Sequence, residues 1–242
     1  IRLTNNLSVS WLPSVIVSGS VVHVVWEDNR DGNFEIYCKR STDGGITWGQ
    51  DLRLTNNSAN SRTPSAAVSG SVIHVEWEDD RDGNQEIYCK RSTDGGVSWG
   101  TDMRLTNNND SSLSPSVAIS GTFVQVIWYD TRDGNYEIYY KRSADGGISW
   151  GGDTRLTNNP ALSAFPCIAV SGSVVHVVWT DERDGNAGIY YKRSTNGGIS
   201  WGNDTRMNHD SVLAFMPSIV VSGSVVHIVW NDNRDDYIRD TD

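Results

Sequence analysis

The sequence predicts an all-β fold, a five-bladed β-propeller of four-stranded antiparallel blades, from three observations. Its 242 residues include 23 Gly and 10 Trp but only 6 Pro, and long runs of helix-forming residues are absent, which favours short strands joined by glycine turns. A repeat returns every 51 residues, a spacing typical of a propeller blade. Each repeat divides into four strand-like segments, which makes one blade.

The repeat runs through the whole chain at a constant interval. Its copies begin with the tract Arg-Leu-Thr-Asn-Asn at Arg2, Arg53, Arg104 and Arg155, and in degenerate form at Arg206. Its prolines are Pro13, Pro64, Pro115, Pro166 and Pro217, and its tryptophans are Trp26, Trp77, Trp128, Trp179 and Trp230. We therefore expect a single domain, 1–242, built from units 1–51, 52–102, 103–153, 154–204 and 205–242.

The first unit illustrates the expected strands. A β-branched run covers 13–18, and 21–26 is apolar on both faces apart from His23, as in a strand packed between neighbouring sheets. The pair Asp31-Gly32 predicts a two-residue type I′ hairpin turn. The third and fourth strands are expected at 34–40 and 46–55.

The fifth unit is shorter than the others. After two strand segments it ends in a degenerate stretch, 235–242. Residues 1–4 match the end of a fourth strand, so we expect the N-terminal strand to close the fifth blade and to cover an exposed sheet edge. The alternatives are that the chain belongs to a larger ring or closes through another copy.

A tight turn follows the third strand. It reads Ser, any residue, Asp or Asn, Gly-Gly, any residue, Ser or Thr, and Trp, at 41–48, 92–99, 143–150 and 194–201. The Asp or Asn oxygen can accept backbone N–H groups, the glycines supply positive φ, and the Trp closes the base of the hairpin. These segments resemble the Asp-box, or bacterial neuraminidase repeat, of sialidase-like β-propellers. The resemblance implies a turn on the face away from the active site and an extracellular or secreted protein.

Charge and composition exclude several classes of partner. The net charge of −10 disfavours nucleic acids and anionic membranes by long-range repulsion, and no stretch approaches the ~20 apolar residues of a membrane span. We expect no nucleic-acid partner, no membrane insertion and no cofactor. Cys38 and Cys89 occupy equivalent repeat positions, which indicates packing rather than a disulfide.

A calcium loop is also disfavoured. The segment 78–83 has the opening spacing of such a loop, with Glu78, Asp80 and Asp82 before a glycine. Tyr129 and Thr180, which replace Glu78 in later repeats, have no carboxylate, and the later ligand spacing fails. We therefore expect no bound metal.

Recurring Asp and Arg residues follow each second strand. The resemblance implies that these loops share the functional face with the loops that enter each first strand. The recurring acids are Asp28, Asp79, Asp130, Asp181 and Asp232, and the arginines are Arg30, Arg81, Arg132, Arg183 and Arg234. One interpretation is a polar rim whose arginine forks bind carboxylates or hydroxyls. The other is a set of Asp–Arg pairs within each blade that order the hairpin.

Residues that depart from the repeat are the better candidates for a site. The loops that enter the first strands vary, and they include Trp11, Arg62, Phe165 and Phe215. Aromatic and apolar side chains at a rim could stack on sugar rings or anchor a peptide. Alternatively, they cap the channel or pack on neighbouring loops.

Glu76 is the weak catalytic candidate. Its counterparts are apolar, for example Val25 and Ile127, and it lies two residues after His74 on the same strand face. Burial would raise its pKa, as in a general acid. The alternative is a buried pair with His74 or a nearby Arg. The recurring His23, His74, His176 and His227, with Gln125 in the third unit, are expected to form structural bonds between blades.

The resemblance does not assign catalytic residues. A sialidase would need one asymmetric cluster of three arginines, a Tyr nucleophile with a supporting Glu, and an Asp acid/base. Here the Arg and Asp positions are near copies of one another, and the N-terminal Phe-Arg-Ile-Pro tract is missing. We therefore expect a secreted recognition module that binds a glycan or protein ligand. The alternatives are an exo-sialidase-like glycoside hydrolase and a structural repeat scaffold without a small-molecule ligand.

Overall fold

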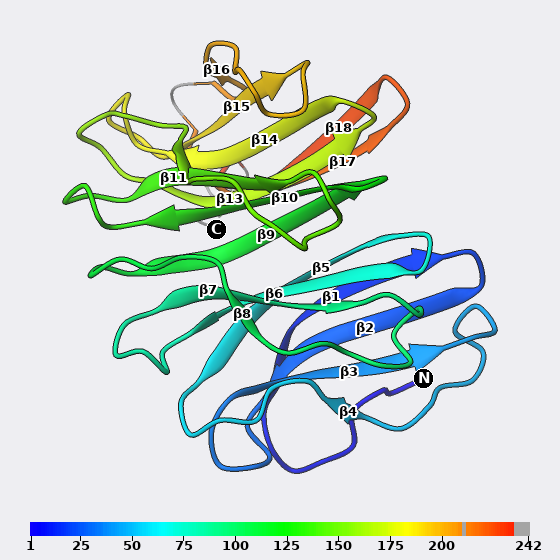
Figure 1. Ribbon diagram of the computed structural model, residues 1–242. Helices are drawn as coiled ribbons and strands as arrows, with labels where there is room; N and C mark the ends of the chain where they lie inside the picture. Colours follow the sequence, from blue (N-terminus) through cyan, green and yellow to red (C-terminus); the bar gives the residue numbers. More distant parts are fainter. Residues whose placement is uncertain (210–211, 235–242) are drawn as a thin grey trace, which may run out of the picture.

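The computed structural model describes residues 1–209 and 212–234 and contains five antiparallel sheets, one for each repeat unit (Figure 1). Four sheets have four strands, and the fifth has two in the described part of the chain. The sheets, called blades 1 to 5, follow one another in chain order. The all-β propeller class is confirmed. No helix in the described ranges is long and apolar enough to cross a membrane.

The strands of the blades recur at equivalent positions. Blade 1 contains β1 (Ser10–Ser18), β2 (Val21–Asp28), β3 (Glu35–Ser41) and β4 (Leu52–Arg53); blade 2 contains β5 (Ser61–Ser69), β6 (Val72–Asp79), β7 (Glu86–Ser92) and β8 (Met103–Arg104). Blade 3 contains β9 (Ser112–Ser120), β10 (Phe123–Asp130), β11 (Glu137–Ser143) and β12 (Thr154–Arg155); blade 4 contains β13 (Ser163–Ser171), β14 (Val174–Asp181), β15 (Gly188–Ser194) and β16 (Thr205–Arg206). Blade 5 contains β17 (Ala214–Ser222) and β18 (Val225–Asp232).

The core lies between neighbouring blades. Val25 and Ile36 of blade 1, both fully buried, pack with Val75 and Trp77 of blade 2 in one apolar cluster. Equivalent clusters join blade 2 to blade 3 and blade 3 to blade 4. The second strand of an inner blade is therefore buried on both faces, which explains its nearly continuous apolar sequence.

Two local expectations are wrong. Pairing of β2 with β3 ends at Asp28 and Glu35, so a longer loop replaces the two-residue type I′ turn. In this loop Gly32 has a φ of +107° and donates its N–H to the Asn29 carbonyl at 3.2 Å. The fourth strand is also much shorter than expected, because the chain returns to β3 only after the tight turn has ended.

The expected closure of blade 5 by residues 1–4 is not found. Leu3 instead packs against Trp26 and Tyr37 of blade 1, and Lys39 donates to its carbonyl. Lys90 makes the same contact with Leu54, in the link between blades 1 and 2. The N-terminal segment therefore takes the position of a link between blades. The degenerate stretch 235–242 lies outside the described residues.

Apolar faces remain exposed at both ends of the blade series. Val15 of blade 1 is 59% exposed, whereas its counterpart Ile168 in blade 4 is 5% exposed. At the other end, Val229 of blade 5 is 65% exposed, whereas Val178 is fully buried. First strands of adjacent blades pack closely, and packing of that extent is not found between β1 and β17 in the described structure. The described blades thus form an open series.

Candidate functional site

The antiparallel topology gives each blade two opposite ends that carry loops. The β2–β3 loop lies beside the start of β1, since Asn29 donates its N–H to the Val9 carbonyl at 3.2 Å. The tight turn after β3 lies at the opposite end, where Gly44 donates its N–H to the Ser20 carbonyl in the β1–β2 turn. We call these two ends the loop face and the turn face.

The tight turn on the turn face has the geometry expected from its sequence. Asp43 accepts the Thr47 N–H at 2.9 Å and the Ser41 hydroxyl at 2.7 Å, and Trp48 donates its indole N–H to the Gly45 carbonyl at 3.0 Å. The hydrogen bonds from Thr47 lower the pKa of Asp43 to about 2. Asn196 keeps the backbone bond in the fourth copy. The Ser and the Asp or Asn side chains thus hold the chain reversal in all four copies. The indole bond is particular to Trp48, since the indole nitrogens of Trp99, Trp150 and Trp201 have no hydrogen-bond partner within 1–209 and 212–234.

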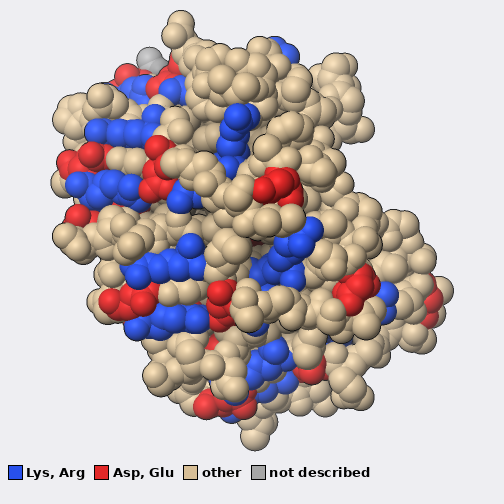
Figure 2. Space-filling view, viewed as in Figure 1, with Lys and Arg blue, Asp and Glu red and all other residues tan. Residues whose placement is uncertain are grey.

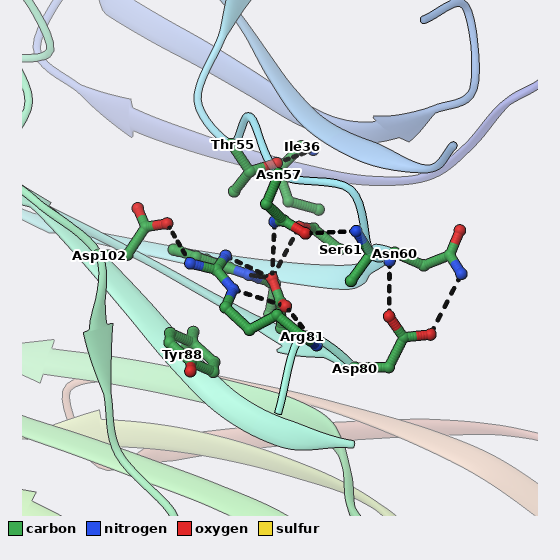
Figure 3. A network of polar contacts seen from close by, with 12 residues as sticks. Ile36, Thr55, Asn57, Asn60, Ser61, Asp80, Arg81, Tyr88 and Asp102 are labelled. Atoms are coloured by element: carbon green, nitrogen blue, oxygen red, sulfur yellow. Dashed lines mark hydrogen bonds and ion pairs between the residues drawn. The ribbon is translucent and has the colours of Figure 1, made fainter. Parts of the chain in front are cut away.

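The polar network around Arg81 shows how the recurring Asp and Arg residues are used (Figure 3). Asp79 is fully buried and accepts hydrogen bonds from Trp77 at 2.8 Å and Ser61 at 2.8 Å. Arg81 donates to both Asp79 oxygens, at 2.7 and 2.6 Å, and a third nitrogen reaches Asp102 at 2.9 Å. The guanidinium also lies 4.3 Å from the Tyr88 ring centre.

The electrostatics of Asp79 follow from this network. Burial alone would raise its pKa, but the hydrogen bonds from Arg81, Trp77 and Ser61 outweigh burial and lower it. Equivalent ion pairs join Arg30 to Asp28, Arg132 to Asp130, Arg183 to Asp181 and Arg234 to Asp232. This geometry agrees with the interpretation of in-blade pairs that order the hairpin. Ligand binding by these residues stays a prediction.

A different group of side chains, none of it repeated in all blades, joins blades 1 to 4 on the loop face. We call it the loop-face cluster, and its members are Trp11, Glu27, Phe34, Arg62, Glu78, Ser114, Tyr129, Tyr136 and Phe165. Each blade contributes residues from the start of its first strand, from the end of its second strand, or from the loop that follows.

The first half of the cluster spans blades 1 and 2. Glu27 is fully buried and accepts the Thr63 N–H at 2.8 Å, and the Arg62 guanidinium lies 3.3 Å from its other oxygen. Arg62 also lies over the Phe34 ring, 4.3 Å from its centre, and Phe34 stacks on Trp11 with ring centres 6.1 Å apart. An arginine thus bridges a buried carboxylate and an aromatic pair.

The second half spans blades 2 to 4. Glu78 accepts the Ser114 N–H at 2.8 Å. Burial raises the pKa of Glu78 and the Glu27 charge adds to this, against the Ser114 N–H and the Arg62 charge. Burial likewise raises the pKa of Tyr129, and the nearby Glu78 charge contributes. Two neighbouring groups therefore both hold their protons more tightly than in water.

Aromatic rings flank Tyr129 on two sides. Its ring centre is 5.2 Å from that of Tyr136 and 5.7 Å from that of Phe165, in both cases edge to face. Trp11 is 54% exposed, and Tyr136 and Phe165 are each 38% exposed. Apolar ring surface is therefore accessible on both sides of the acidic groups, as in sites that hold sugar rings.

A backbone distortion turns the N–H groups of Thr63 and Ser114 toward Glu27 and Glu78. The first strand of every blade has a register shift there, and one residue adopts a left-handed conformation. The residues are Leu12, Thr63, Ser114, Phe165 and Met216, with φ between 48° and 53°. Such a conformation is unfavourable for non-glycine residues. In three of the five described blades the turned N–H bonds to a side chain of the preceding blade: Thr63 to Glu27, Ser114 to Glu78 and Met216 to Thr180.

The structure brings three of the variable candidate residues together. Trp11, Arg62 and Phe165 belong to the loop-face cluster, whereas Phe215 lies one blade further on. Sequence reasoning missed Glu27, Glu78 and Tyr129 as site residues. These occupy one repeat position that also holds Thr180 and Asn231, so their variation was the available signal.

Glu76 lies apart from the cluster, in the middle of β6. It is fully buried, burial raises its pKa, and its carboxylate is 3.4 Å from the His74 ring. The partner is the His74 of the alternative, but the pair is not satisfied, because neither Glu76 oxygen has a hydrogen-bond partner among the described residues. A catalytic role would require substrate to reach a closed interior. His74 also bonds to the Gly146 carbonyl of blade 3 at 3.1 Å, whereas His176 bonds to Tyr191 within its own blade.

Cavities also occur away from the cluster. One of about 460 Å³ is lined by Arg91, Trp99 and Ile148, and one of about 550 Å³ by Phe123, Gln125 and Ile199. Both lie near the tight turns. The three cysteines, Cys38, Cys89 and Cys167, are free thiols.

Comparison with known proteins identifies the fold. No family model and no curated protein matches the sequence. A Trypanosoma rangeli sialidase matches with a TM-score of 0.59 and 15% identity over 80% of this chain and 37% of that one. The intramolecular trans-sialidase of Ruminococcus gnavus matches with a TM-score of 0.63 and 12% identity, over 82% of this chain and 71% of that one. A mutant α-L-arabinofuranosidase of Fusarium graminearum matches with a TM-score of 0.65 and 14% identity, over 91% of this chain and 74% of that one. The chain has a sialidase-type β-propeller fold and spans little more than a third of the first enzyme.

Proposed function

We propose that this chain is a glycoside hydrolase of the sialidase-like type, with its site at the loop-face cluster. The observation that carries the proposal is the position of Glu78 beside Tyr129, on adjacent blades and at a place where the repeat is broken. The fold neighbours include sialidases and an arabinofuranosidase. An extracellular or secreted location belongs to the same proposal, by resemblance.

The proposed chemistry uses Tyr129 as nucleophile and Glu78 as its base. The Tyr129 oxygen forms a bond to the anomeric carbon as its proton passes to Glu78, and the bond to the leaving oxygen breaks. That oxygen takes a proton from solvent. Water then attacks the anomeric carbon and loses a proton to solvent, while the bond to the Tyr129 oxygen breaks and this oxygen takes its proton back from Glu78. A raised pKa makes Glu78 a stronger base than an exposed carboxylate, provided that it is ionised. The flanking aromatic rings would hold the sugar faces.

The test measures turnover of fluorogenic 4-methylumbelliferyl glycosides, including an α-sialoside and an α-L-arabinofuranoside. We expect turnover of at least one, with kcat reduced about 100-fold or more in Tyr129→Phe and Glu78→Gln. Thr180→Val is the matched control, because Thr180 occupies the Glu78 position in blade 4 and accepts the Met216 N–H at 3.2 Å. Equal losses in all three variants would indicate a structural effect and contradict the proposal.

A second candidate is recognition of a glycan without turnover. This candidate is favoured by the hydrogen bonds that the two carboxylates already accept, since Glu27 accepts the Thr63 N–H and Glu78 accepts the Ser114 N–H. Both carboxylates would then shape the loop face, and the exposed rings would bind the ligand. Glycan-array binding without turnover of any fluorogenic substrate, together with loss of binding in Trp11→Ala, would support this candidate over hydrolysis.

A further inference from the structure

We infer that the loop-face cluster takes an uncharged sugar unit and discriminates against acidic sugars. This inference rests on the proposed carbohydrate site and adds its substrate class. It is carried by the charges of the cluster and by the partners of the arginines on the loop face.

Four of the five recurring arginines are already neutralised. Arg30, Arg81, Arg132 and Arg183 each form ion pairs with two aspartates, at distances of 2.6 to 2.9 Å. The guanidinium of each also lies over a tyrosine ring of its own blade. On the face seen in Figure 2, Lys and Arg side chains form rows with Asp and Glu directly beside them. A carboxylate ligand would have to compete with these bidentate pairs.

The charge within the cluster is not positive either. Arg62 is its one cationic member; it pairs with Glu27 at 3.3 Å, and its charge also acts on Glu78. With both acids ionised the three groups sum to one negative charge, and with Glu78 protonated they sum to zero. An acidic sugar would therefore enter a neutral or negative site.

Binding of an anionic ligand by Arg62 would also disturb the ion pair between Arg62 and Glu27. Glu27 is fully buried, and Arg62 is its ion-pair partner. If Arg62 turned toward an anion, Glu27 would keep the Thr63 N–H but would lose its counter-charge in a buried position. An unpaired buried charge is strongly unfavourable, so the ion pair with Glu27 opposes anion binding.

The remaining surface suits a neutral sugar. Trp11 and Phe34 offer stacked rings on one side, and Tyr136 and Phe165 offer rings on the other. Such rings bind the C–H faces of sugars. Tyr129 contacts both rings of the second pair, and Glu78 lies on blade 2, next to the blade of the first pair; their oxygens can bond to hydroxyl groups.

The decisive experiment compares matched probes on the intact chain. Binding of lactose and 3′-sialyllactose is measured by calorimetry, and turnover is measured with 4-methylumbelliferyl β-galactoside, α-L-arabinofuranoside and α-sialoside. We expect a neutral probe to be bound or cleaved at least ten times better than its sialylated counterpart. Equal or better use of the sialylated probes would overturn the inference and leave the proposed carbohydrate site intact. No binding and no turnover of any probe would overturn both.

A charge variant tests the physical cause. Glu78→Gln removes one carboxyl from the cluster, so the binding ratio of 3′-sialyllactose to lactose should rise several-fold. Glu182→Gln removes an exposed carboxylate from the loop after β14 and should leave the ratio unchanged. A fall in that ratio in Glu78→Gln would contradict the inference. If Glu78→Gln fails to fold, a salt series on the unchanged protein gives the same readout, because screening should weaken the discrimination.

Discussion

Arg81 holds the buried carboxylate of Asp79 by two parallel hydrogen bonds, with Nε 2.7 Å from Oδ1 and Nη2 2.6 Å from Oδ2. The same pair recurs in the neighbouring blades, so each loop after a second strand is tied to its own sheet. The geometry agrees with a structural role for these Asp–Arg pairs, and ligand binding by them stays a prediction.

Asp79→Asn should destabilise the protein by about 3–5 kcal/mol, because the Arg81 guanidinium loses a buried partner. Urea denaturation measures the change, and Asp110→Asn, at an exposed loop position, is the control. The Asp79 pKa is lowered in the folded protein. Its contribution is therefore present above the unfolded value of about 3.9 and is lost as pH falls through the folded value. A variant as stable as the control would contradict this role.

Glu76→Val should stabilise the protein by about 1–3 kcal/mol, because it removes two buried carboxyl oxygens that lack hydrogen-bond partners in the described structure and restores the residue found at Val25 and Val178. Burial raises the Glu76 pKa, so its contribution is most favourable below about pH 4.3 and is lost as pH rises through the folded value. The gain should thus be larger at neutral pH. Thermal unfolding at several pH values checks this, and Glu76→Gln should abolish the pH dependence of the difference.

Leu12→Asn should raise the free energy of unfolding by roughly 0.5–1 kcal/mol. Leu12 has a φ of 48° and is exposed, and asparagine adopts this left-handed conformation at lower cost. Val17→Asn is the control, since Val17 is also exposed but is not among the residues with positive φ. Chemical denaturation of both variants decides the point. Equal effects would show that backbone strain at this position is negligible.

Turnover of any glycoside should decline as pH falls through the raised pKa of Glu78, because a protonated Glu78 cannot accept the Tyr129 proton. The midpoint should lie above the ordinary glutamate value of about 4.3. Glu78→Gln should lose this acidic limb along with most of its activity. A pH–rate profile of kcat measures the midpoint, and an acidic limb that survives in the variant would assign the titration to another group.

The fold was largely predictable because the repeat shows its own boundaries. Equal intervals placed five blades, and the apolar run around Val25 placed the strand that is buried on both faces. Loop details were less predictable. The turn after β2 depends on a carboxylate, Asp28, that accepts the Arg30 N–H at 3.0 Å, and such a bond is not visible in strand propensity.

The candidate site was predictable only in part. Trp11, Arg62 and Phe165 attracted attention because they break the repeat, and the structure joins them to one cluster. Glu78 also breaks the repeat, but in sequence it opens a segment with the first spacing of a calcium loop and without the later ligand spacing. Its meaning depends on Tyr129 and Ser114, which belong to the next blade and lie more than 35 residues away.

The sequence by itself determined the blade, its number of copies and the turn that closes each third strand, because these are set by local periodicity and glycine chemistry. The tertiary structure decided which Glu is paired, which Arg is already neutralised and where the N-terminal segment lies. Those outcomes depend on contacts between blades, where burial changes the strength of charges and hydrogen bonds. Val178 and Val229 are 51 positions apart and identical in type, yet Val178 is buried and Val229 is exposed, because only Val178 is covered by a neighbouring blade.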